Sequence, residues 1–513
     1  MQEPLCTYRI ANFKTTSADK DAGAAFLKYK DFKPYVDYFN SMEDENIAQA
    51  VPNVRASQWM EENIPLFECS QKNFEEMYYY RWWTLRKHIK ETPVGYGMTE
   101  FLVNRSYADK YNLIACAIGH HIYESRWLHN PEYLNQIIHT WYRGNEGGPM
   151  AKMTKFSSWN ADAVLGRYMV DGNKEFLLDM VKDLEAEYAR WEKTNRLSNG
   201  LYWQGDVQDG MEESISGGRR KQYARPTINS YMYGNAKALS LIGIMTGDEG
   251  MAMKYGLKAD SIKTLVQDKL WNTDHHFFET MRGDASAEVR EAIGYIPWYF
   301  NLPDASSQYD VAWKEVMDEK GFSAPYGLTT AERRHPEFRT HGVGKCEWDG
   351  AIWPFASAQT LTAMANFMNN YPQTVLTDSV YFHQMERYVE SQHHRGRPYI
   401  GEYLDEVTGY WLKGDQERSR YYNHSTFNDL MITGLIGLRP RMDNTVEVNP
   451  LIPEGKWDYF CLDNVLYHGR NLTILWDKDG SRYQRGKGLH IYVDGKEVGH
   501  ADTLTRVLCE NVL

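Results

Sequence analysis

A chain of 513 residues with 42% hydrophobic residues is long enough for one large domain with accessories and can fill a substantial core. Its net charge is −12 and it has no concentrated Lys/Arg stripe, which excludes the electrostatic footprint of a nucleic-acid-binding protein. No segment approaches the apolar length of a transmembrane helix, so we expect neither nucleic acid nor a membrane as a partner.

The cysteines and the first residues bear on metals and on the compartment. Six cysteines are widely spread with no C-x-x-C pair, so neither a zinc knuckle nor a dense disulfide framework is indicated, and we expect no cofactor. The first residues, MQEPLCTYRIANF, lack the basic-then-apolar order of a signal peptide. The protein is therefore either cytoplasmic, or periplasmic or secreted with a leader removed; the sequence leaves the compartment and the oligomeric state open.

Helical periodicity dominates the middle of the chain. Residues 1–65 are mixed and polar, and we expect an irregular N-terminal arm there. Residues 66–438 contain about twelve amphipathic segments, as where apolar side chains recur every four residues from Phe176 to Tyr188. Paired helices with loops rich in Gly, Asn, Asp and Trp, and without a fixed-length repeat, fit a mainly α (α/α)6 toroid better than a solenoid.

After residue 438 the hydrophobic period changes to two. The segments TVEVNP, NVLYHGRNLTILWDKDG and GLHIYVDGKEVGH read as strands, and Asp494-Gly495 marks a hairpin turn. We therefore predict a small, sandwich-like β-rich domain over residues 439–513.

An acidic loop occupies residues 199–217, NGLYWQGDVQDGMEESISG. Glycines break its helical continuity, and it carries four carboxylates, Asp206, Asp209, Glu212 and Glu213. Their spacing is wrong for an EF-hand, although an irregular calcium site and a plain surface loop both stay open. The nearby aromatic residues favour a partly desolvated acid, whose raised pKa would suit a general acid near neutral pH.

Glycoside hydrolysis needs two carboxyl groups, one to protonate the leaving oxygen and one to activate water or attack the sugar. The best candidate for the second lies on a second acidic loop, residues 401–415, GEYLDEVTGYWLKGD. Asp405 and Glu406 compete with Glu402 there, but DEVTG reads as a turn, which leaves Glu402 as the inward residue.

Polar and aromatic residues recur together where helices begin, and carbohydrate sites need this mixture, because sugar rings stack on aromatic faces and their hydroxyls bond amides and carboxylates. The adjacent histidine pairs, in contrast, are expected to be structural. The candidate sugar-binding residues are Trp159, Asn160, Arg225, Asn229, Tyr231, Trp348, Asp349, Trp353 and His424.

At these motifs the sequence resembles the (α/α)6-barrel glycoside hydrolases of family 63 and the related mannosylglycerate-hydrolase-like and trehalase-like enzymes. Residues 210–214 (GMEES) stand where that group has S-G-M-D-N-S, and residues 402–409 (EYLDEVTG) match its E-N-Y-D-P-x-T-G loop. Residues 348–354 (WDGAIWP) match W-R-G-x-x-W-P, and GLIGLRP at 434–440 also fits. The likeness covers roughly residues 66–440, in the same order.

The resemblance implies a six-hairpin toroid in which Glu212 is the general acid, Glu402 is the general base and the anomeric configuration is inverted. Two positions depart from the family pattern: Glu212 replaces an Asp, so Asp209 stays an alternative acid, and Asp349 replaces an Arg.

We therefore expect an exo-acting, inverting glycoside hydrolase that removes a terminal sugar from an oligosaccharide or polysaccharide. The alternatives are a sugar epimerase or isomerase on an α/α toroid, which would need inward histidines as bases, and a non-catalytic glycan-binding protein.

Overall fold

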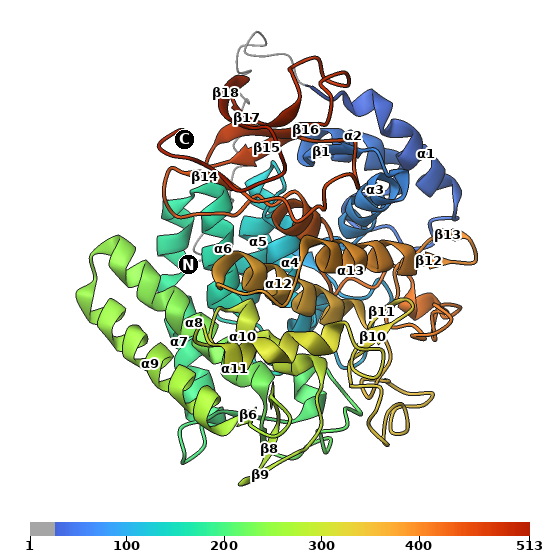
Figure 1. Ribbon diagram of the computed structural model, residues 1–513. Helices are drawn as coiled ribbons and strands as arrows, with labels where there is room; N and C mark the ends of the chain where they lie inside the picture. Colours follow the sequence, from blue (N-terminus) through green and yellow to red (C-terminus); the bar gives the residue numbers. More distant parts are fainter. Residues whose placement is uncertain (1–25) are drawn as a thin grey trace, which may run out of the picture.

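The computed structural model describes residues 26–513, and Figure 1 shows a mainly helical body with a strand-rich part at one side. The helices are α1 (Lys33–Ser41), α2 (Asn53–Asn63), α3 (Lys72–Lys87), α4 (Ile118–Ser125), α5 (Pro131–Arg143), α6 (Asn160–Asp171), α7 (Lys174–Asn195), α8 (Pro226–Thr246), α9 (Glu249–Lys269), α10 (Ile296–Tyr299), α11 (Ser307–Asp310), α12 (Pro354–Asn370), α13 (Asp378–Ser391) and α14 (Asn428–Leu430).

Contacts between these helices close a ring. Helix α4 contacts α6, α6 contacts α8, α8 contacts α10, α10 contacts α12, α12 contacts α14, and α14 contacts α4 again. Helices α5, α7, α9 and α13 pack outside this ring, each against a member of it. An inner ring with an outer layer is an (α/α)6 toroid, so the predicted fold class is confirmed.

Local signals set where these helices begin and end. The Asn130 side chain caps α5 by accepting from the backbone N–H of Glu132, and Pro131 occupies the first turn. Gly172 ends α6 in the left-handed conformation, and Asn173 then caps α7. A very short connection therefore suffices to reverse the chain from the inner ring to the outer layer.

The prediction of an irregular N-terminal arm is wrong for much of its described part, and residues 1–25 lie outside the described residues. Residues 33–41 and 53–63 are helical, because their buried side chains, among them Val36, Phe39 and Trp59, pack on the barrel. Tertiary packing here outweighs a polar sequence with little periodicity of its own.

The C-terminal part is rich in strands, as predicted. Strands β15 (Tyr459–Tyr467), β16 (Arg470–Asp477), β17 (Gly488–Val493) and β18 (Lys496–Ala501) form an antiparallel sheet. The turn between β17 and β18 is the expected Asp494-Gly495 pair, with positive φ at both residues. Strand β14 (Val446–Val448) pairs with β19 (Val507–Cys509).

This sheet also includes a strand from the other end of the chain. Strand β1 (Leu66–Cys69) pairs with β15, so that Leu66 lies opposite Asp463 and Cys69 opposite Phe460. The predicted boundary between residues 438 and 439 therefore separates two stretches of sequence but does not separate the sheet from the earlier chain.

Short strands connect the helices. They are β2 (Ile89–Thr92), β3 (Gly95–Met98), β4 (Trp203–Gln204), β5 (Tyr223–Ala224), β6 (Trp271–Asn272), β7 (Phe277–Phe278), β8 (Met281–Arg282), β9 (Ala285–Ser286), β10 (Ser323–Ala324), β11 (Gly327–Leu328), β12 (His393–His394) and β13 (Arg397–Pro398). In residues 26–513, no helix combines the length and apolar character needed to cross a bilayer.

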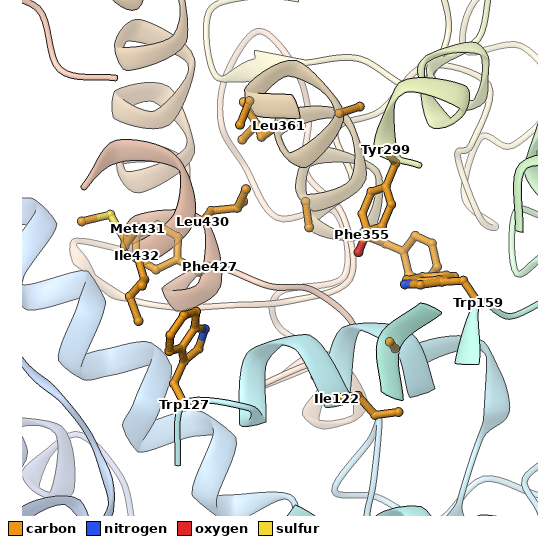
Figure 2. Close-up of a cluster of buried hydrophobic side chains, with 14 of the residues drawn as sticks. Ile122, Trp127, Trp159, Tyr299, Phe355, Leu361, Phe427, Leu430, Met431 and Ile432 are labelled. Carbon is orange, nitrogen blue, oxygen red and sulfur yellow. The ribbon is translucent and has the colours of Figure 1, made fainter. Parts of the chain in front are cut away.

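Buried aromatic residues fill the centre of the inner ring, and three of them lie together in Figure 2. We call them the aromatic floor: His120 on α4, Trp159 at the start of α6, Tyr231 on α8, Tyr299 on α10 and Phe355 on α12. Ring centroids are 4.8 Å apart for Trp159 and Tyr231, 5.9 Å for Trp159 and Tyr299, and 4.5 Å for His120 and Phe355. Since each of five inner helices contributes one ring, the floor divides the bore of the toroid.

Candidate active site

A cavity of about 330 Å³ opens on the side of the floor where the inner helices begin. Phe355 and Trp353, at the start of α12, line the cavity at the end nearest the aromatic floor. The rest of its wall comes mainly from loops. Three carboxyl groups on three separate loops face it, those of Glu100, Glu212 and Glu402. We call it the carboxyl cavity.

Glu212 reaches the cavity because the acidic loop turns sharply before it. Residues Asp206–Asp209 form a short 3-10 helix, and Gly210 then adopts the left-handed conformation, with φ of 73°. A Cβ atom at Gly210 would also lie 3.4 Å from the Cβ of Cys116, so glycine suits this turn best. Burial, and then the nearby charge of Glu402, raise the pKa of Glu212 to about 7.

Asp209, the alternative acid, lies on the other side of the same turn and does not line the cavity. Its carboxylate accepts from Ser157 Oγ at 2.6 Å, from Arg225 Nε at 2.7 Å and from the Thr227 hydroxyl. The ion pair with Arg225 is fully buried. Asp209 therefore anchors the acidic loop to the start of α8.

The two remaining acids of this loop hold its shape. Asp206 accepts from the backbone N–H groups of Val207, Gly218 and Arg219, and it is buried. Glu213 forms an ion pair with the Arg219 side chain. Of the four carboxylates, the structure brings Glu212 alone into the cavity lining.

Glu402 faces cations. Arg418 Nη2 lies 2.9 and 2.8 Å from its two carboxylate oxygens, and Lys413 Nζ lies 3.3 Å from Oε2. Two cations therefore lie within 3.3 Å of this carboxylate, one from Arg418 and one from Lys413. Main-chain pairing of Leu404 with Ile352 and with Trp411 holds the second acidic loop in place.

Asp405 and Glu406, the competitors of Glu402, point elsewhere. Both carboxylates accept from Arg339 Nη1 at 2.6 Å, and Asp405 also caps the turn through the N–H groups of Val407 and Thr408. These contacts agree with the reading of DEVTG as a turn.

Glu100 was missed by the sequence analysis. It follows β3, is buried, and accepts from the Tyr422 phenol at 2.5 Å and from the Cys116 thiol at 3.3 Å. Burial, followed by the charges of Glu402 and Glu212, raises its pKa to about 8. A single Glu after GYGMT belongs to no motif, and only its apolar neighbours in the sequence hinted at burial.

Two of the nine predicted sugar-binding residues, Trp353 and His424, line the carboxyl cavity. The indole of Trp353 stacks between the rings of Trp348 and Tyr403, at centroid distances of 4.3 and 4.5 Å. His424 is buried, which lowers its pKa well below the ordinary value, and its Nε2 has no hydrogen-bond partner among the described residues. It therefore presents a neutral imidazole.

The other predicted sugar-binding residues do not line this cavity, because their side chains are buried against other parts of the protein. Trp159 and Tyr231 belong to the aromatic floor. Arg225 is committed to Asp209, and Trp348 lies behind Trp353.

The remaining three are amides and a carboxylate with partners inside the protein. Asn160 donates to Glu187 at 3.0 Å, and Asn229 donates to the carbonyl of Tyr202 at 2.8 Å. Asp349 accepts from the N–H groups of His341 and Gly342 and so shapes the loop before α12. Polar residues at helix starts thus mostly build the loops that carry the site.

Within residues 26–513, no three His, Cys, Asp or Glu side chains are grouped as a metal site requires. Cys69, Cys116, Cys346, Cys461 and Cys509 are free thiols.

A second cavity, of about 400 Å³, lies beyond the aromatic floor. Tyr299 of the floor lines it, together with Thr362 and Asn370 from the far half of α12 and Arg439 and Glu447 from the segment that leads into the strands. Phe355 and Asn370 are separated by roughly 20 Å along α12. The two cavities therefore occupy opposite ends of the bore.

Comparison with known proteins agrees with this architecture. Residues 110–425 match the family model described as the mannosylglycerate hydrolase MGH1-like glycoside hydrolase domain, and residues 438–500 match the C-terminal domain of glycosyl hydrolase family 65. The solved structure of a protein named sialidase is 82% identical, with a TM-score of 0.96. That match covers 97% of this chain and 46% of the sialidase, so this chain spans less than half the length of that protein.

More distant structures share the fold. The family 63 mannosylglycerate hydrolase from Thermus thermophilus, solved with glucose, is 12% identical with a TM-score of 0.53, over 69% of this chain and 99% of that one. The family 78 rhamnosidase of Bacillus sp. GL1 is also 12% identical with a TM-score of 0.53, over 80% and 40% of the two chains. The predicted resemblance is confirmed: the chain belongs to the MGH1-like glycoside hydrolase family.

Proposed function

We propose that this chain is an exo-acting, inverting glycosidase in which Glu212 protonates the glycosidic oxygen and Glu402 activates the attacking water. The observation that carries the proposal is the pairing of two carboxyl groups in one cavity with opposite environments. Burial raises the pKa of Glu212 to about 7, whereas two cations flank Glu402. The two carboxyl groups thus differ in their surroundings, and glycoside hydrolysis needs two carboxyl groups with different roles.

The direction of the Glu212 shift fits its role. A carboxyl group with a pKa near 7 keeps its proton at neutral pH and can still release it to a leaving oxygen. When substrate binds and excludes water, the carboxylate of Glu402 continues to favour the protonated form of Glu212, because the repulsion between like charges is no longer screened by solvent.

Exo action is supported by the closed end of the cavity. Its volume of about 330 Å³ lies at the small end of the range for ligand sites, roughly 300–1,000 Å³, and it ends at the aromatic floor. Such a blind pocket has room for a terminal sugar residue and gives a chain no second exit. Trp353, stacked between Trp348 and Tyr403, adds an apolar edge to the wall that this sugar would contact.

The substrate proposal is an oligosaccharide or polysaccharide with a terminal residue that fits this pocket. The name of the 82% identical protein, sialidase, belongs to a chain more than twice as long, so it does not identify the sugar removed by this region.

The test is a turnover assay on aryl glycosides and on plant and host glycans, with the anomer of the first product followed by NMR. We expect a single terminal monosaccharide whose anomeric configuration is opposite to that of the substrate. Release of internal fragments would contradict exo action, and a product with retained configuration would contradict the water-activating role of Glu402.

A further inference from the structure

Glu100 contributes a third carboxyl group to a cavity whose proposed reaction uses two. It comes from the turn after β3, whereas Glu212 and Glu402 come from the two acidic loops. It has no ion-pair partner among Lys and Arg residues of the described chain; the one charged-pair contact recorded for it is His424 Nδ1, 3.9 Å from Oε1. Its carboxyl group is therefore buried beside other acids without a compensating cation.

Several titratable groups interact with Glu100 or line the cavity with it. They are Tyr107, Cys116, Glu212, Glu402, Tyr422 and His424. The cationic side chains that line the cavity are Lys155 and Arg418, and the Arg418 guanidinium binds both oxygens of Glu402. His424 is neutral because it is buried, which lowers its pKa.

This environment favours the protonated form of Glu100. Burial, with a smaller contribution from the charges of Glu402 and Glu212, raises its pKa to about 8. As a neutral acid, Glu100 accepts from Tyr422 on Oε1 and from the Cys116 thiol on Oε2, and still has one O–H donor to offer. Beside it, His424 Nδ1 lies 3.9 Å from Glu100 Oε1.

We propose that Glu100 is a specificity-determining residue of this glycosidase site, which binds a hydroxyl group of the terminal sugar as a neutral carboxylic acid. The proposal rests on the proposed function and names its substrate class: an uncharged sugar. A sugar hydroxyl can accept from Glu100 and donate to Nδ1 of His424, which lies 3.9 Å from Glu100 Oε1. A sugar carboxylate at this position would instead be desolvated near Glu402, whose neighbouring cations Lys413 and Arg418 are already bound to it, and this burial of charge costs binding.

The first experiment reads the proton on Glu100 without any substrate. Infrared difference spectra of the wild-type protein and the Glu100→Gln variant are recorded at pH 7 and again above pH 9. We expect the carbonyl absorption of a protonated carboxyl group at pH 7 that the variant lacks and that alkaline pH removes. Unchanged spectra at pH 7 would overturn the proposal.

A matched control is available in Glu187. This carboxyl group is also buried, with a raised pKa, and accepts from a phenol, that of Tyr142 at 2.5 Å, but it does not line the cavity. The Glu187→Gln variant should leave the specificity of the enzyme unchanged.

The second experiment measures specificity. Turnover is compared on 4-nitrophenyl glycosides of neutral sugars, on 4-nitrophenyl glucuronide and on a 4-methylumbelliferyl sialoside. We expect wild-type kcat/KM to be highest on a neutral glycoside, to fall about tenfold in Glu100→Ala, and to recover in Glu100→Gln, which keeps a neutral donor. Removing the bound hydroxyl from the substrate should cost the wild type about tenfold and the Ala variant little.

The outcomes separate the two proposals. If the wild type cleaves neutral glycosides and Glu100→Ala matches it, or if an acidic sugar is the best substrate, the role of Glu100 is overturned while the glycosidase mechanism stands. If the wild type cleaves none of the panel, the proposed exo activity fails. Calorimetric titration of the wild type and Glu100→Ala with the free monosaccharides then decides whether Glu100 binds an uncharged sugar.

Discussion

The two ends of the toroid's bore carry cavities of similar size and very different electrostatics. In the second cavity, Asp429 is paired with Arg126 at 2.8 Å and Glu447 with Arg441 at 2.9 Å. In the carboxyl cavity, Glu212 and Glu100 have pKa values raised to about 7 and about 8, and neither is bound to a Lys or Arg side chain in residues 26–513.

The difference shows that volume and charge content alone do not identify a site. The second cavity is larger and holds more charged side chains, yet its charges mostly neutralise one another. In the carboxyl cavity, Glu212 and Glu100 are buried without compensating cations, which lowers folding stability. Such uncompensated groups are typical of sites that transfer protons. Substitutions at the two ends should therefore have different readouts.

The largest effect is expected for Glu402→Gln, which removes the proposed base. We expect kcat to fall about 10³-fold, because the amide cannot take a proton from water. The matched variant at the other end, Glu447→Gln, should leave kcat unchanged. Steady-state kinetics on the best aryl glycoside checks both variants. A near-wild-type kcat in Glu402→Gln would contradict its proposed role as the base.

Asp209→Asn tests whether the alternative acid is structural. Loss of its charge leaves Arg225 buried and unpaired, so we expect the free energy of unfolding to fall by about 3 kcal/mol. Denaturant titration measures it. The folded variant should still lose activity as the pH rises through about 7, because the pKa of Glu212 is unaffected. A stable variant whose activity does not fall at alkaline pH would identify Asp209 as the acid.

Glu212→Gln should lower kcat/KM by about 10²-fold on natural glycosides and less on 4-nitrophenyl glycosides, whose leaving group needs less protonation. The pKa of Glu212 is raised to about 7, so wild-type activity should persist below pH 7 and fall as the pH rises through it. The variant should lack this decline. An unchanged alkaline limb would show that another group is the acid.

The smallest effect is expected for Asp162→Asn in the second cavity. Burial raises the pKa of Asp162 from 3.8 to about 6, so the folded state holds this proton more tightly than the unfolded chain. Wild-type stability should therefore decrease as the pH rises from about 4 to 6, and the Asn variant should lack this component. Activity should stay within about twofold of wild type, and a larger loss would mean that the two ends are coupled.

Much of this could be predicted from the sequence. Periodicity located the barrel helices, and the change to period two located the strands, because both patterns report which face of an element is buried. The two acidic loops were found because catalysis requires carboxyl groups from separate segments. The local sequence of the second loop also predicted the turn at Asp405 and the inward position of Glu402.

What could not be predicted depends on contacts between distant residues. The environment of Glu100 is set by Cys116 and Tyr422, the latter 322 residues away along the chain, and no local pattern encodes that meeting. Trp159 and Asn160 were expected at the sugar, yet they pack in the floor and against Glu187. A helix start gives the position of a residue along the bore but not whether its side chain faces the cavity or the interior.

Strand β1 has a consequence for how the chain folds. Its pairing with β15 joins Leu66 to Asp463, so the sheet cannot be completed until nearly the whole barrel has been synthesised. Contacts of such long sequence separation form slowly, because the loop between them must first be closed. Until then the exposed edge of β1 is open to pairing with other chains, and truncation before residue 459 should leave it so permanently. Soluble expression of the barrel should therefore require the strands that follow it.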